Sequence, residues 1–305
     1  MQTIRISHKP CTLPSVLCAC LPPSLVDAVG RCEATAVEEL RLHAGRYATV
    51  TSRGRSLDTG ILLSDKELSE ILKRMCQGSL YAYSQTINQG YLTMPGGIRV
   101  GVCGTAAVEG GEIIGISAIS GLMIRIPHAV NVSPAPVLER FLAAEGLRGI
   151  LVYAPPGHGK TTLLRAVTAA LASPPHTRRT VAVDTRAELQ FGLEDRQLNL
   201  DILVGYPRAT GIEIAVRTMG AEVIVCDEIG NAADAHAILL AANCGVPLVA
   251  SAHAATLSEL LERPFMQSLH RAHVFGTYVG IRRGGPLGFT YLFTDWHEAD
   301  KGVRV

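Results

Sequence analysis

The sequence predicts two domains: an α/β domain built on a parallel β-sheet, preceded by a smaller α+β domain. In the second half, short apolar strands alternate with helical segments, which is typical of a parallel sheet covered on both faces. The first half mixes helices with strands joined by glycine-rich turns, and a proline-rich joint near 130–136 separates the halves. At 305 residues the chain can bury two cores, and we place the domains at 1–134 and 135–305.

Bulk composition narrows the classes of function. The net charge of +1 gives no overall basic field and only 5% of the residues are aromatic, so no nucleic-acid partner is expected. The eight cysteines form no CxxC pair and no zinc-type spacing, which favours a reducing compartment such as the cytoplasm. Cys226 and Cys244 lie in apolar runs, so we expect both in the core.

Several short elements are expected in the first half. The segment from Ser64 to Glu67 is a capping box, which predicts a helix that runs to about residue 76. Tyr81 and Tyr83 introduce another helix, and their spacing favours core positions over base stacking. The other expected elements are a helix over 25–29 and strands over 38–43, 98–105 and 115–126, with a turn at Gly110-Gly111.

Strands and helices alternate after the joint. Residues 235–258 contain no Asp, Glu, Lys or Arg and are long enough to span a bilayer, but His236, Asn243 and Gly245 favour a buried helix, a turn and a buried strand. The expected strands begin near Gly149 and cover 180–184, 222–227 and 247–252, with a helix over 135–145 and a final hairpin of 273–281 and 289–294. Ligands of such sheets bind at the carboxyl ends of the strands.

Residues 151–164 have the pattern of a phosphate-binding loop (P-loop), since an apolar strand, a glycine-bearing turn and a helix follow one another. Gly157 and Gly159 let backbone N–H groups approach an anion. Lys160 adds a cation for the β- and γ-phosphates, and Thr161 offers a hydroxyl to Mg²⁺. The usual pattern begins with Gly, and here that position is Ala154. The residues expected to bind ATP are Pro156, Gly157, His158, Gly159, Lys160, Thr161 and Thr162.

Two other strands end in carboxylates. Asp227 follows an apolar strand and is expected to hold Mg²⁺ through water, together with Thr161. Glu228 would face the γ-phosphate and orient or deprotonate the attacking water. Asp184 and then Glu188 follow the strand over 180–184, on the same edge of the sheet. Either Glu188 or Glu228 could be the general base, and placement at a strand end favours Glu228.

Phosphoryl transfer needs further positive charge in the transition state. His253 follows the strand over 247–252 and would reach the γ-phosphate, where it could distinguish ATP from ADP. Arg217 precedes the acidic strand, whereas Arg99 and Arg125 lie in the first domain. We treat His253 and Arg217 as candidate catalytic residues and the other two arginines as candidate phosphate ligands.

The chain resembles a known family from about Leu21 to the C-terminal hairpin. The P-loop, Val-Asp-x-Arg-x-Glu188, Asp227-Glu228-Ile-Gly230 and Ser-Ala-His253 are similar to the secretion-type ATPases of type II and type IV systems. Ser79-Leu-Tyr-Ala-Tyr83, Gln89-Gly-Tyr-Leu-Thr93, Gly97-Ile-Arg-Val-Gly-Val-Cys-Gly104 and Ile124-Arg-Ile126 resemble the stage III sporulation protein AA family. Peptide matches of this length are more specific than a P-loop alone.

The resemblance implies a RecA-like P-loop domain that hydrolyses Mg-ATP within a homo-oligomer, usually a hexameric ring. It implies a cytoplasmic protein, peripherally associated with membrane channel proteins of a sporulation complex, that energises a channel between mother cell and forespore during endospore formation. It also implies that ATP lies between the domains, where Arg99 and Arg125 reach its phosphates. It assigns water activation to Glu188 and the metal shell to Glu228. Two other functions stay open: an ATP-binding ring scaffold without productive hydrolysis, and a nucleic-acid translocase.

Overall fold

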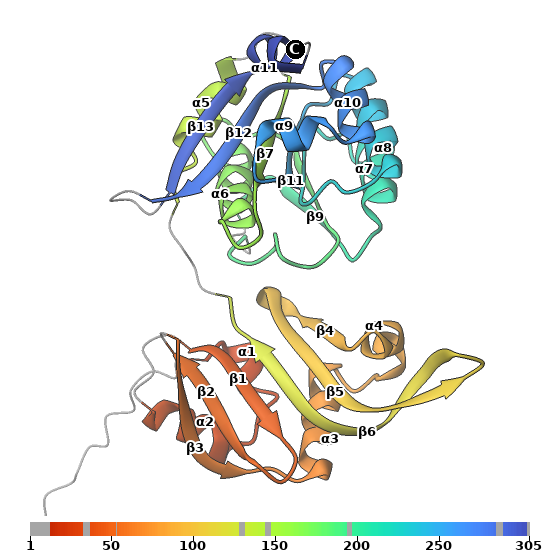
Figure 1. The fold of residues 1–305 in the computed structure, drawn as a ribbon. Helices are drawn as coiled ribbons and strands as arrows, with labels where there is room; N and C mark the ends of the chain where they lie inside the picture. The colour runs from red at the N-terminus through yellow and green to blue at the C-terminus, as the bar shows by residue number, and fades with distance from the viewer. Residues whose placement is uncertain are drawn as a thin grey trace, which may run out of the picture. The chain divides into compact units, whose positions relative to one another are not determined.

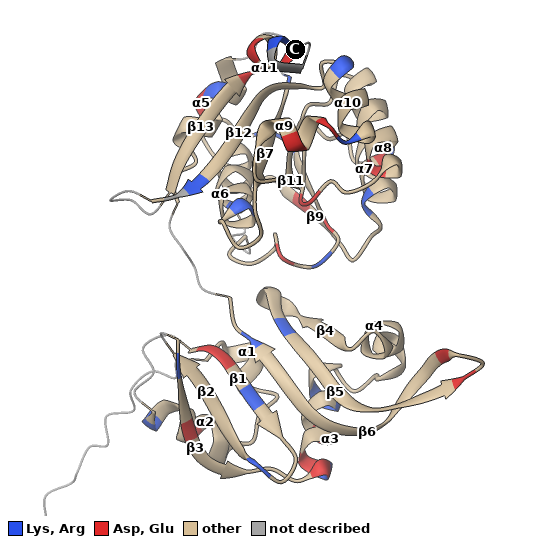
Figure 2. Ribbon diagram, viewed as in Figure 1, with Lys and Arg blue, Asp and Glu red and all other residues tan. Residues whose placement is uncertain are grey.

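The computed structural model describes residues 13–32, 37–52, 54–127, 132–143, 148–193, 197–284 and 289–303 (Figure 1). The chain divides into two compact units, Met1–His128 (unit 1) and Ala129–Val305 (unit 2). Lysine and arginine positions are interspersed with aspartate and glutamate positions in both units (Figure 2), which agrees with the net charge of +1.

Unit 1 is built on a six-stranded antiparallel sheet in the order β3-β2-β1-β6-β5-β4. Its strands are β1 (Val37–His43), β2 (Tyr47–Ser52), β3 (Arg55–Leu62), β4 (Tyr91–Met94), β5 (Ile98–Glu109) and β6 (Glu112–Arg125). Its helices are α1 (Ser15–Cys18), α2 (Pro23–Arg31), α3 (Asp65–Met75) and α4 (Ser84–Asn88), with 3-10 turns at Tyr81–Tyr83 and Pro95–Gly97. Apolar side chains of the longer helices and of the sheet form one core.

The capping box of α3 is confirmed. Ser64 Oγ accepts a hydrogen bond from Glu67 N at 3.3 Å, and Glu67 Oε2 accepts one from Ser64 N at 2.8 Å. The expectation for Tyr81 is wrong, because its side chain is 90% exposed on a short 3-10 turn. Tyr83 is partly buried and packs against the core, as expected.

Unit 2 is built on a seven-stranded sheet in the order β13-β12-β7-β11-β10-β8-β9. The edge strand β13 runs antiparallel to β12, and the other six strands are parallel to one another. The strands are β7 (Gly149–Ala154), β8 (Thr180–Asp184), β9 (Leu200–Val204), β10 (Val223–Cys226), β11 (Leu248–His253), β12 (Phe275–Arg283) and β13 (Phe289–Asp295). The helices are α5 (Ala135–Ala143), α6 (Lys160–Ala172), α7 (Arg208–Thr218), α8 (Ala232–Asn243), α9 (Leu257–Leu261), α10 (Pro264–Arg271) and α11 (Trp296–Val303).

Helices cover both faces of this sheet, which confirms the predicted α/β fold (Figure 1). The helices α5 and α6 pack on one face, where Phe141 and Leu164 meet alternate residues of the strands, such as Val152. The helices α7, α8 and α10 pack on the other face, together with part of α11. Cys226 is fully buried on that second face, as expected, but Cys244 is exposed just after α8, so the expectation for Cys244 is wrong.

The strand order determines where the functional residues meet. Because β7, β11, β10 and β8 are consecutive neighbours and run parallel, their carboxyl ends lie side by side at one edge of the sheet. We call this edge the P-loop edge. His253 is the last residue of β11, and the segments that follow the other three strands contain Lys160, Asp227, Glu228 and Glu188.

Candidate functional site

The loop between β7 and α6 has the backbone that the P-loop pattern requires. Gly157 and Gly159 have φ angles of +72° and +84°, in the left-handed region that glycine adopts without strain. A Cβ atom on Gly159 would also lie 2.8 Å from the ring of Phe289 in β13, so a side chain is excluded here for two reasons. The N-terminus of α6 begins at the next residue and directs backbone N–H groups towards an anion.

Lys160 is directed into the loop. Its side chain is only 5% exposed, and Nζ donates to Ala154 O at 2.9 Å and Pro155 O at 3.0 Å. Burial lowers the pKa of the ammonium group, and the carboxylates of Asp227 and Glu228 oppose the shift. Ala154 is buried at the end of β7 among core residues, so its methyl group has a place in the packing.

Oxygen atoms suited to Mg²⁺ meet beside the first turn of α6. Thr161 Oγ1 donates to Asp227 Oδ2 at 2.8 Å and lies 3.5 Å from Glu188 Oε2. The other oxygen of Asp227 accepts a short hydrogen bond from Ser251. Among the described residues, no group of three or more His, Cys, Asp or Glu side chains could hold a metal by itself. The hydroxyl of Thr161 and the carboxylates of Asp227 and Glu188 are oxygen donors, which fit an ion such as Mg²⁺ that keeps several waters and binds phosphate oxygens.

His253 links the P-loop to Glu228. His253 Nδ1 lies 2.9 Å from Lys160 Nζ, and His253 Nε2 lies 2.9 Å from Glu228 Oε1. Glu228 Oε2 pairs with Arg186 at 2.6 Å, so both carboxylate oxygens have cationic or imidazole partners. Glu228 also has a φ of +56°, which is strained for a residue with a side chain and is typical of functional sites.

Asp184 orders the turn that carries Glu188. Its carboxylate accepts hydrogen bonds from the backbone N–H groups of Glu188, Leu189 and Gln190 at 2.8 to 2.9 Å. Burial raises the pKa of the Asp184 carboxyl, and two of these N–H groups oppose the shift. Ala187, just before Glu188, has a φ of +55°, a second strained position at the P-loop edge. Asp184 is therefore a structural support at the site.

A buried ion pair that we did not predict from the sequence holds the turn after β10. Arg208 Nε donates to Asp227 O at 2.6 Å, and Arg208 Nη1 pairs with Asp234 Oδ2 at 2.8 Å. The same Asp234 oxygen accepts from Gly230 N at 3.0 Å. The side chains of Arg208 and Asp234 are 12% and 4% exposed. These bonds fix both ends of the turn that contains Glu228, although no local motif marks either residue.

The remaining candidates in unit 2 lie at different distances from this site. His158 Nδ1 lies 2.9 Å from Pro156 O within the loop, and Thr162 lies on the first turn of α6. Arg217 is exposed near the C-terminal end of α7, about 14 Å along the helix from Arg208. Because Arg208 marks the end of α7 at the P-loop edge, the structure does not bring Arg217 to the P-loop of its own chain.

Arg99 and Arg125 are brought together within unit 1. They lie directly opposite each other on β5 and β6, and both side chains are exposed. Arg125 Nε pairs with Glu39 Oε2 at 3.3 Å. Glu39 on β1 lies directly opposite Arg125, so its carboxylate offsets part of the repulsion between the two arginines.

Substitutions at Arg208 show whether the geometry of this turn matters for the ATP hydrolysis that the sequence leads us to expect. For that activity, Arg208→Lys is expected to lower kcat by about tenfold, with KM changed less than about threefold, because an ammonium group cannot make the two directed bonds of the guanidinium. Arg208→Ala is expected to destabilise the protein by about 3 kcal/mol in urea unfolding, since Asp234 would stay buried without its partner. Arg271→Ala, at an exposed position on α10, is the control. Wild-type kcat in Arg208→Lys would contradict the positioning role.

The fold and the site define the class of this protein: unit 2 is a RecA-like P-loop domain. The family model described as sporulation stage III, protein AA, matches residues 19–290, and the chain belongs to this family. It is 32% identical over 260 residues to stage III sporulation protein AA of Bacillus subtilis, a match that covers 82% of this chain and 84% of the relative.

Solved structures of secretion and pilus ATPases share the fold. The DotB ATPase of Legionella pneumophila has a TM-score of 0.62 at 16% identity, covering 91% of this chain and 85% of DotB. The pilus retraction motor PilT with bound ADP has a TM-score of 0.60 at 13% identity, covering 84% of this chain and 78% of PilT. The chain is therefore a sporulation stage III protein with a fold similar to these ATPases. In the part of the chain that the structure describes, no helix is long and apolar enough to cross a membrane.

Proposed function

We propose that this protein hydrolyses Mg-ATP and uses the energy as a motor. One observation carries the proposal: Lys160, Thr161, Asp227, Glu228 and His253 come from three separate segments and meet within hydrogen-bonding distance at the P-loop edge. A structural role alone does not explain a buried lysine that donates to loop carbonyl groups beside a histidine and several carboxylates. The likeness to PilT, which was solved with ADP, supports a nucleotide as ligand.

Each residue has a role that its geometry supports. Lys160 and the loop N–H groups bind the β- and γ-phosphates, and Thr162 extends this set along α6. Thr161 and Asp227 would hold Mg²⁺, which supplies positive charge to the phosphate oxygens. His253, already 2.9 Å from Lys160 Nζ, senses the terminal phosphate that reaches the lysine.

The structure favours Glu228 over Glu188 as the general base. Glu188 lies within 3.5 Å of the Thr161 hydroxyl, on the side of the proposed metal. Glu228 instead contacts His253, on the side of Lys160, where the terminal phosphate would bind. We therefore propose that Glu228 accepts the proton of the attacking water and that Glu188 belongs to the metal shell. The family resemblance implies the reverse, so the two glutamates need a direct comparison.

The assembly completes the proposal. We infer that the protein forms a hexameric ring, as is usual for the secretion ATPases it resembles, and that Arg99 and Arg125 supply positive charge to a nucleotide phosphate. We place the ring in the cytoplasm, attached to membrane channel proteins of the sporulation complex that joins mother cell and forespore. No nucleic acid enters this proposal, since the charge of both units is mixed.

The test is phosphate release by the purified full chain with Mg-ATP, followed by particle imaging with and without ATP. We expect turnover that stops when EDTA removes the metal, and rings in the images. Tight ATP binding without phosphate release, even with the membrane partners present, would favour a scaffold instead. Turnover stimulated by DNA in a salt-sensitive manner would favour a translocase.

A further inference from the structure

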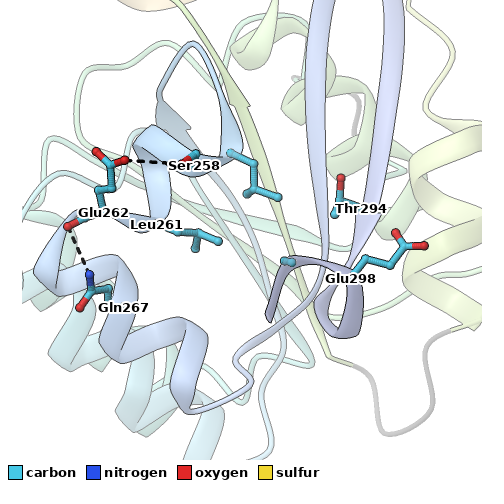
Figure 3. A pocket seen from close by; sticks show the side chains of 8 residues that line it. Ser258, Leu261, Glu262, Gln267, Thr294 and Glu298 are labelled. Carbon is cyan, nitrogen blue, oxygen red and sulfur yellow. Dashed lines mark hydrogen bonds between the residues drawn. The ribbon is translucent and has the colours of Figure 1, made fainter. Parts of the chain in front are cut away.

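Unit 2 has a pocket of about 390 Å³ between α9, α10, α11 and the end of β13 (Figure 3). This volume is in the range of ligand pockets. The pocket is separate from the P-loop. Thr294, which lines it, is level with Tyr278 and with Leu151 in the sheet register, about 10 Å along β7 from Ala154. It therefore belongs to the part of the sheet away from the P-loop edge.

The inner wall of the pocket is apolar. Leu261 and Ala299 are 3% and 5% exposed, and Leu257 beside them is partly buried. The first turn of α11 is held on α10, since Trp296 Nε1 donates to His270 O at 2.8 Å. Ala299, whose side chain is a single methyl group, is one of the residues that line the pocket. The wall can thus accept an aliphatic group of several carbon atoms.

Two carboxylates stand at opposite sides of the opening, Glu262 after α9 and Glu298 on α11 (Figure 3). Glu262 Oε1 accepts a weak hydrogen bond from Ser258 Oγ at 3.5 Å, and Glu298 Oε2 accepts one from Asp295 N at 3.3 Å. Nearby Glu259 has Arg263 at 3.0 Å, but within the described ranges neither pocket carboxylate has such an ion pair. None of the described lining residues is a lysine or an arginine.

We propose that this pocket binds a basic segment of a partner protein, through an arginine side chain. The aliphatic stem would lie on the apolar wall, and the guanidinium would pair with one of the two carboxylates, Glu262 or Glu298. The negative charge of the two carboxylates repels nucleotides and nucleic acid and favours a cationic ligand. The apolar wall of the pocket favours a cation that has an aliphatic stem. The inference goes beyond the proposed function because it does not depend on ATP hydrolysis.

The test uses the full-length protein and a short fluorescein-labelled peptide in which arginine alternates with leucine. Anisotropy at near-physiological salt is expected to show binding that weakens about tenfold in Glu262→Gln/Glu298→Gln. Glutamine keeps an acceptor oxygen, so the start of α11 is retained. The control Glu109→Gln/Glu112→Gln removes the same charge at the exposed tip of the β5–β6 hairpin and is expected to bind within about twofold of wild type. ATP turnover without peptide is expected to be unchanged in both variants.

Two matched peptides separate the parts of the proposal. Citrulline in place of arginine removes the charge, and serine in place of leucine removes apolar contacts; each is expected to weaken binding to the wild type by about fivefold or more. Hydrogen exchange should show protection at 257–267 and 294–299. Protection elsewhere, or wild-type affinity in the Glu262 and Glu298 double variant, would overturn the proposal. Equal displacement of the peptide by spermidine would identify a polyamine site and would also overturn it.

Discussion

Replacing Lys160 by alanine is expected to lower ATP turnover by about a thousandfold and to weaken ATP binding. Lys160 is the buried cation at the P-loop edge, with Nζ 2.9 Å from Ala154 O. Transfer of a phosphoryl group depends on charges that are already in place, and water cannot replace an ammonium group in this loop. The measurement is phosphate release at saturating Mg-ATP, together with a titration of a fluorescent ATP analogue.

The control for this prediction is Lys73→Ala, at an exposed position on α3 in unit 1, which is expected to keep wild-type turnover. Lys160→Ala leaves two loop carbonyl groups and His253 without their partner, so thermal unfolding is measured to establish that the variant is folded. Turnover within about tenfold of wild type in a folded Lys160→Ala protein would be incompatible with the assigned site.

The second large effect is expected from Glu228→Gln, which should lower kcat by about a hundredfold or more while ATP affinity changes little. Glutamine keeps the size of the side chain and its contacts to His253 and Arg186, but it cannot accept the proton of water. The measurement is single-turnover hydrolysis of bound ATP, which separates chemistry from binding.

Glu188→Gln is the matched variant, because it removes one negative charge from the same site. We expect it to raise the Mg²⁺ concentration needed for half-maximal turnover and to keep most of kcat at saturating Mg²⁺, since Glu188 lies on the Thr161 side. If Glu188→Gln abolishes the chemical step and Glu228→Gln does not, the roles must be exchanged, as the family resemblance implies.

Sequence patterns predicted most accurately the strands whose residues are buried on both faces of the sheet. The strands β7, β8, β10 and β11 are continuous apolar runs, because both of their faces are covered, and their positions were predicted within about two residues. The strands β2, β3 and β9 were not predicted. Residues along β3 are largely exposed, and the mixture of Asp, Gly and Ser in it gives no alternation that sequence reasoning can detect.

The residues of the site were likewise predicted from the sequence only in part. The P-loop and the strand-end acids were recognisable because local spacing determines their chemistry. The contact of Arg208 with Asp227 and Asp234 joins residues 19 and 26 positions apart, and it depends on how α7 packs beside β10 and α8. No local sequence pattern indicates that an arginine at the start of a helix will pair with an aspartate so far away in the chain. Arg217 was predicted because it is close in sequence to the acidic strand. In the structure it lies near the C-terminal end of α7, away from the P-loop edge.

The hydrogen bonds of Lys160 have one more consequence. Its ammonium group already has three partners in the chain itself, two carbonyl oxygens and an imidazole nitrogen. A phosphate that binds to Lys160 must replace at least one of these internal partners, which offsets part of the binding free energy. In the proposed ATPase cycle, the same groups can bind the lysine again when phosphate leaves. The carbonyl and imidazole partners of Lys160 would therefore compete with phosphate and limit the retention of product.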